Sequence, residues 1–329
     1  MVLLCSALVF STISYGVAEW YIQKHRKEPL SYGATFIADY ARSLDLDAKE
    51  TLNAIISDLN IKQLRLVSYW KNIEAVEGKY DFSDLDWQFD IANKAGIKVS
   101  LSIGVRQPRW PECHEPNWLD TNNNDWYAKL NSFITAVVDH YKNNPVLSSY
   151  QLENEFFMQS FGDCTDYNKQ RLIDEFNMVK KLDGARPIIV TRSNNWIGIP
   201  VGSPRADLVG ISVYKRIWDK TITKRYYEYP LPPWFYAALA GYTELFTDRN
   251  MYIHELQAEP WLPEGYSLKS ASIDEMYKSM NTTILKKRLS YAKDTGMKQI
   301  DLWGVEWWYY MKEKRNAPEM WDTAKVQLQ

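Results

Sequence analysis

The sequence predicts one eight-stranded β/α barrel, a TIM barrel, over residues 31–329, preceded by an N-terminal segment over residues 1–30. Short apolar runs alternate with longer amphipathic runs, as expected for buried parallel strands joined by crossover helices. Eight strand candidates occur in this alternation, which is the number that closes such a barrel. A doubly wound sheet would favour a glycine-rich first turn, and neither GxGxxG nor GxxxxGK[ST] is present.

The strand candidates are short, apolar and rich in β-branched or aromatic residues. They are Tyr32–Ile37, Gln63–Val67, Lys98–Ile103, Ser148–Leu152, Pro187–Thr191, Leu208–Val213, Met251–His254 and Gln299–Trp303. Helical periodicity fills five of the intervals between them. The predicted helices are Ala48–Leu59, Ser83–Ala95, Asp125–Lys142, Asn168–Leu182 and Ile273–Thr295. The interval from Lys215 to Asn250 is interpreted as the longest loop, which would project from the catalytic end of the barrel.

The N-terminal stretch Val2–Ala18 contains no charged residue and is close to the lower limit of about 17 residues for a membrane-spanning helix. Trp20 and Tyr21 follow it and suit a membrane interface, and a basic cluster comes next. We therefore predict an apolar signal-anchor-like helix that holds an extracytoplasmic catalytic domain at the membrane, or a secreted protein. The basic cluster after the span favours a cytoplasmic domain instead. A helix packed under the barrel is the non-membrane alternative.

Composition narrows the class of partner. The 14 Trp and 22 Tyr exceed what a core needs and favour a groove that binds sugar rings, although ordinary core packing would also use aromatic residues. A net charge of -2 without a basic stripe argues against nucleic acid. Four histidines and three cysteines without CxxC or HExxH spacing predict no metal and no cofactor. A monomer is expected.

Two cysteines follow successive predicted strands. Cys113 comes after Lys98–Ile103, and Cys164 comes after Ser148–Leu152, so both belong to loops at the same end of the barrel. A disulfide between them is a hypothesis that would indicate an oxidising compartment.

Acidic residues follow two of the predicted strands, at the barrel end where active sites lie. Glu155 lies just beyond the fourth strand, and Glu255 directly continues the seventh. Two carboxyl groups at such positions suit glycoside hydrolysis, which needs a proton donor and a nucleophile or base. Either glutamate alone is more simply explained as a loop salt bridge. Glu259 is a rival to Glu255, but it precedes Pro260 and belongs to the loop.

The pattern resembles clan A glycoside hydrolases, and most closely the family 5 cellulase-like enzymes, over nearly the whole chain after residue 31. This resemblance implies that Glu155 is the acid/base and Glu255 the nucleophile. It also implies that Asn154, which precedes Glu155, binds substrate by donating to the sugar 2-hydroxyl. It also implies that Arg65 and Tyr214 support the nucleophile. Other substrate-binding candidates are Trp303, Trp70, Trp261, Trp307, Glu112 and His114. The chain departs from the family pattern at Ser212, where a histidine is common, and after Glu255, where Leu256 and Gln257 follow.

The implied function is a retaining glycoside hydrolase that cleaves β-linked glucan- or mannan-type carbohydrate by double displacement. Retention predicts carboxyl groups roughly 5–5.5 Å apart. A transglycosylase with the same residues is one alternative. A non-catalytic barrel that binds glycans is another, and it would lack one of the two glutamates. A metal-dependent barrel hydrolase would need clusters of His and Asp, and only His254 lies near a strand end.

Overall fold

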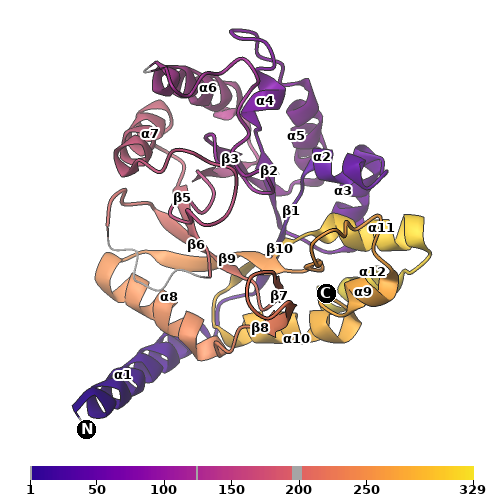
Figure 1. Ribbon diagram of the computed structural model, residues 1–329. Coiled ribbons are helices and arrows are strands. Elements are labelled where there is room, and N and C mark those ends of the chain that lie inside the picture. Colours follow the sequence, from indigo (N-terminus) through magenta and orange to yellow (C-terminus); the bar gives the residue numbers. More distant parts are fainter. Residues whose placement is uncertain (1, 124, 195–201) are drawn as a thin grey trace.

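The computed structural model describes residues 2–123, 125–194 and 202–329, with side chains described from residue 9 onward. Eight parallel strands form a closed barrel in the order β1-β10-β9-β6-β5-β4-β3-β2, and helices surround it (Figure 1). The predicted TIM barrel is therefore confirmed. The strands are β1 Ser31–Thr35, β2 Gln63–Val67, β3 Lys98–Ile103, β4 Leu147–Leu152, β5 Ile188–Arg192, β6 Leu208–Val213, β9 Asn250–Gln257 and β10 Gln299–Trp303.

Several of the crossover helices begin or end at residues with clear capping chemistry. The side chains of Asp47, Asn168 and Asn281 each accept a hydrogen bond from a backbone N–H in the first turn of a helix. Gly96 ends its helix with φ 65°, a left-handed conformation that suits glycine. The crossover helices of this part of the barrel are α3 Ala48–Asp58, α5 Ser83–Ala95, α6 Trp126–Tyr141, α7 Lys169–Leu182 and α10 Thr282–Asp294.

The interval predicted as one long loop is folded, so that prediction was wrong. It contains an antiparallel hairpin of β7 Arg216–Asp219 and β8 Arg225–Glu228, and then the helix α8 Pro233–Thr247. Pro232 and Pro233 lie at the start of α8, where a missing N–H costs no hydrogen bond. The predicted helix Ile273–Thr295 is interrupted, because α9 ends at Tyr277 and Asn281 caps a new helix. Short or terminal helices add α2 Ala38–Ser43, α4 Trp70–Ile73, α11 Val305–Arg315 and α12 Glu319–Gln327.

The N-terminal segment forms the helix α1, Val2–His25, which starts well away from the barrel and reaches it beside α8 (Figure 1). Within residues 2–123, 125–194 and 202–329, no helix is long and apolar enough to cross a membrane. The membrane-spanning, signal-anchor interpretation is therefore not supported. The second half of α1 instead packs on the fold, because Ala18 and Tyr21 are buried and His25 Nε2 lies 2.8 Å from Glu244 of α8.

Candidate active site

Glu155 and Glu255 meet in a buried position at the carboxyl end of the barrel. Glu255 is part of β9, and Glu155 lies three residues beyond the end of β4. One oxygen of each carboxyl group and one ring nitrogen of His254 all lie within 4.8 Å of one another. The two glutamates predicted from strand position are thus brought together, 100 positions apart in the sequence (255 − 155).

Both carboxylate oxygens of Glu255 are held in place. Arg65 Nη2 in β2 donates to Oε1 at 2.6 Å, and the Tyr214 hydroxyl donates to Oε2 at 2.6 Å. Arg65 is itself fixed, because it donates to Thr35 Oγ1 at 2.9 Å and to Gln151 Oε1 at 2.8 Å. A carboxylate with a buried guanidinium and a phenol as donors has one fixed orientation, as an attacking group requires.

Glu155 has a contrasting environment. Burial, followed by the charges of Glu255 and Glu112, raises the pKa of Glu155 to about 8. The Ser212 hydroxyl donates to Glu155 Oε1, and this hydrogen bond lowers the pKa of Glu155, against the effect of burial. A carboxyl group that keeps its proton near neutral pH can serve as a general acid.

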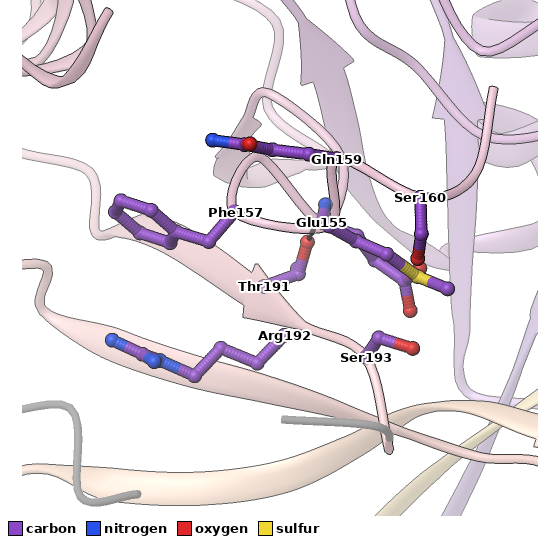
Figure 2. Close-up of a pocket in the computed structure, with 8 residues that line it drawn as sticks. Glu155, Phe157, Gln159, Ser160, Thr191, Arg192 and Ser193 are labelled. Atoms are coloured by element: carbon purple, nitrogen blue, oxygen red, sulfur yellow. Dashed lines mark hydrogen bonds between the residues drawn. The ribbon is translucent and has the colours of Figure 1, made fainter. Parts of the chain in front are cut away.

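The backbone of Glu155 is held in a conformation that non-glycine residues seldom adopt, with φ 43°. Its N–H donates to Thr191 Oγ1 of β5 at 2.8 Å, which fixes this turn. Figure 2 shows Glu155 beside Thr191 and Ser193, whereas Phe157 and Arg192 extend to the other side. The residues around Glu155 line a hollow of about 440 Å³.

Asn154 has less freedom than the family pattern implies. Its Nδ2 donates to Glu112 Oε2 at 3.0 Å, and its Oδ1 accepts from Gln151 Nε2 at 3.0 Å. Glu112 is a third buried carboxyl group in the site, and burial raises its pKa to about 7. One proton of the Asn154 amide remains for a ligand.

A cavity of about 570 Å³ opens over the two glutamates, and several predicted residues line it. Tyr214, Trp261 and Trp303 are part of its wall. Trp303 is only 7% exposed, so it presents a small surface to a ligand. Trp110, which is 63% exposed, lies at the rim.

Trp70 and Trp307 do not belong to this cavity, which corrects their prediction as substrate-binding residues. Both are 0% exposed. Trp70 Nε1 donates to Glu74 Oε2 at 2.7 Å and the ring stacks on Phe133. Trp307 Nε1 points to Met276 Sδ at 3.3 Å. A side chain without exposed surface has no face for a sugar, so these rings are part of the core.

The loops after β3 and β4 are joined by a disulfide between Cys113 and Cys164. Arg106 strengthens the same connection, because its Nε donates to the Asn154 carbonyl at 2.6 Å and its Nη2 donates to the Phe161 carbonyl at 2.9 Å. Neither Arg106 nor the cavity residue Arg109 was predicted from the sequence. An arginine shortly after a strand has no distinctive spacing, so no pattern marked them.

His254 with the two glutamates is a group that could offer ligand atoms to a metal ion. The Arg65 guanidinium already neutralises Glu255 at 2.6 Å and would repel a cation there. Burial lowers the pKa of His254 well below its usual value, so the imidazole is neutral.

Comparison with known proteins gives a partial match to one glycosidase family. The family model described as beta-galactosidase, glycoside hydrolase family 42, matches residues 47–131. Beta-galactosidase BbgII of Bifidobacterium bifidum is 30% identical over 117 residues, which cover 30% of this chain and 17% of that protein. The chain therefore spans about a fifth of that relative's length.

Solved structures share the fold. A GH5_18 protein of Bifidobacterium longum in complex with Manβ1-4GlcNAc has a TM-score of 0.59 at 13% identity, over 83% of this chain and 68% of that one. A beta-galactosidase of Halorubrum lacusprofundi has a TM-score of 0.55 at 11% identity, over 84% of this chain and 52% of that one. The comparisons support a glycoside hydrolase.

Proposed function

We propose that the chain is a retaining glycoside hydrolase that acts on β-linked hexosides, with Glu155 as acid/base and Glu255 as nucleophile. The observation that carries this proposal is the short separation of the two carboxyl groups, whose nearest oxygens lie within 4.8 Å. Inverting enzymes separate theirs by roughly 6.5–9.5 Å to leave room for water, whereas retaining enzymes use about 5–5.5 Å. The spacing here favours direct attack by one carboxylate.

The assignment of roles follows from the surroundings of the two groups. The raised pKa of Glu155 keeps its proton available for the departing glycosidic oxygen. Glu255 has its position fixed by Arg65 and Tyr214 and attacks the anomeric carbon, which forms a glycosyl ester. Glu155, now ionised, then takes a proton from water, and the water oxygen displaces Glu255 with overall retention.

Glu259 is disfavoured as the nucleophile by its contacts. It accepts hydrogen bonds from Tyr40 of α2 and from Arg109 in the loop after β3. The cluster that contains Glu155 includes Glu255. We therefore assign Glu259 to the wall of the cavity.

The substrate class is argued from the relatives and from the cavity. The matched family model and the first relative are beta-galactosidases, and the resemblance to family 5 adds glucosides and mannosides. Para-nitrophenyl β-galactoside, β-glucoside and β-mannoside are therefore the first substrates to test. Added alcohol acceptors in the same assay distinguish hydrolysis from transglycosylation by their products.

Azide rescue tests the two roles separately. In Glu255→Ala, azide attacks from the side of the missing carboxylate, and the glycosyl azide has inverted configuration. In Glu155→Ala, azide reacts with the glycosyl-enzyme, and the product has retained configuration. A Glu255→Ala enzyme with wild-type turnover and no response to azide would refute the proposal. Glu112→Ala is the control for loss of a buried carboxyl group, and it should form neither of the two glycosyl azides.

A further inference from the structure

An ion pair crosses the mouth of the barrel on one side of the catalytic glutamates. Arg109, from the loop after β3, donates from Nη2 to Glu259 Oε1 at 3.0 Å, and Glu259 lies in the loop after β9. Between β3 and β9 the barrel order contains β2, β1 and β10. The pair therefore spans three strands and separates their loops from the rest of the mouth. We call Arg109 and Glu259 the strap.

Aromatic residues hold the strap in place. The Arg109 guanidinium lies 3.3 Å from the centre of the Tyr40 ring and 4.7 Å from the centre of the Trp303 ring. The Tyr40 hydroxyl donates to the second oxygen of Glu259. A guanidinium between two aromatic faces, paired with a carboxylate, is a rigid arrangement.

The β3 loop is shaped to bring Arg109 to this position. Arg109 has φ 81° and Glu112 has φ 72°, which are left-handed conformations that cost on the order of 1 kcal/mol each outside glycine. The Tyr69 hydroxyl donates to the Pro108 carbonyl at 2.6 Å, and the Tyr69 ring stacks on His114 at 3.6 Å. These contacts hold the β3 loop against the segment that follows β2.

The catalytic cavity ends at the strap. Among the residues that the structure describes, Arg109, Glu259 and Trp303 line the cavity, but no residue of the loops after β1 or β2 does. The lining also includes Trp261, Trp218 of the hairpin, and Trp110, which is 63% exposed. The hollow beside Glu155 shares Met158, Ser160 and Ser193 with this cavity. A sugar chain in the site can therefore extend on the Glu155 side, but not past the strap.

We propose that the strap closes the glycone side of the site, so that the enzyme is exo-acting and removes single β-linked sugars from a non-reducing end. This inference rests on the proposed glycosidase function. The terminal sugar lies between Glu255 and the strap, and the leaving group extends along the open direction beside Glu155. Arg109 Nε is buried without a hydrogen-bond partner in the described part of the chain, and it is available to a hydroxyl of the terminal sugar.

The test compares a para-nitrophenyl β-monoside with the para-nitrophenyl glycoside of the matching disaccharide. Initial products are separated by chromatography and identified by mass. An exo-acting enzyme releases one hexose from the disaccharide substrate and leaves the para-nitrophenyl monoside. Release of the intact disaccharide with para-nitrophenol as a first product of the wild type would overturn the inference while leaving the glycosidase function standing. No turnover of any substrate by the wild type would instead refute the proposed function.

Strap variants then test the cause. Arg109→Ala and Glu259→Ala are expected to lower kcat/KM for the monoside by about tenfold or more, which is the usual loss for a charged hydrogen bond. Both variants should begin to release intact disaccharide, because the closed side is opened. Arg42→Ala is the matched control, since Arg42 forms exposed pairs with Asp39 and Asp84 outside the cavity. Strap variants with the same kcat/KM and products as Arg42→Ala would show that the strap does not set the mode of action.

Discussion

Arg65 Nη2 lies 2.6 Å from Glu255 Oε1, although the two residues are 190 positions apart in the sequence. Both side chains are almost without solvent exposure, so the ion pair is buried. Burial of two charges is costly unless geometry and further hydrogen bonds compensate, and here Thr35, Gln151 and Tyr214 supply them. This network fixes the orientation of Glu255, the proposed nucleophile.

Replacement of Arg65 should therefore affect both activity and stability. Arg65→Lys keeps the charge but loses the planar fork, and kcat/KM for the aryl glycosides should fall by about 100-fold. Arg65→Met leaves Glu255 buried without its cation, so the free energy of unfolding should fall by about 3–5 kcal/mol. Steady-state kinetics and urea unfolding measure the two effects. Wild-type kcat/KM in Arg65→Met would contradict this role.

The pH dependence of activity should report the proton on Glu155. Because burial raises its pKa to about 8, kcat/KM of the wild type should fall as the pH rises through that value. Ser212 donates to the ionised carboxylate and lowers this pKa, so Ser212→Ala should move the basic limb to higher pH. The acidic limb should stay in place.

A second serine gives the control for this experiment. Ser149→Ala removes a buried hydroxyl whose partner is Ser100 Oγ at 2.9 Å, away from the glutamates. Its pH profile should match that of the wild type. A basic limb that moves equally in both variants, or in neither, would argue against the contact between Ser212 and Glu155 as its cause.

The proximity of Glu155 and Glu255 could be predicted, because the ends of parallel barrel strands meet at one face. Glu155 and Glu255 follow strands whose apolar runs are easy to locate, and all strands end at the same face. Trp70 and Trp307 also lie close to strand ends, yet both are buried. The distance of a residue from a strand end in the sequence indicates how near its backbone lies to the site. The direction of its side chain depends on how the following helix packs.

The strap and the long insertion could not be predicted for a related reason. Arg109 and Glu259 are 150 positions apart, and neither has a spacing that marks it. The helix α8 was not predicted, because prolines open it. Its apolar surface packs against α1, where Gly241 of α8 lies close to Val17. Such contacts depend on tertiary packing between distant segments, which a local pattern does not contain.

The disulfide between Cys113 and Cys164 should contribute to both stability and activity. It closes a separation of 51 residues, for which loop entropy gives about 4 kcal/mol and typical measured values are about 2–4 kcal/mol. Cys113→Ser with Cys164→Ser should therefore lower the melting temperature. Activity should fall as well, because Glu112 and Arg109 are in the loop that the bond restrains. A reductant should lower the melting temperature and activity of the wild type and leave those of the double variant unchanged. Equal melting temperatures of the wild type and the double variant would contradict the prediction.

Asp301 of β10 should make the fold less stable at alkaline pH. Asp301 is fully buried, and Gln299 Nε2 donates to its Oδ2 at 3.3 Å. Burial raises the pKa of Asp301 to about 7. The folded state thus holds a proton that the unfolded state, with a pKa near 3.9, releases. This contribution to stability is complete below about pH 4 and is lost as the pH rises through about 7.

Asp301→Asn keeps the shape of the side chain without its charge. At pH 8 the free energy of unfolding of this variant should therefore exceed that of the wild type by about 1 kcal/mol or more. Near pH 4 the difference should vanish. Urea unfolding at both pH values measures this difference. Asp294→Asn, at an exposed helix end, is the matched control, and an Asp301→Asn gain that is the same at both pH values would contradict the linkage.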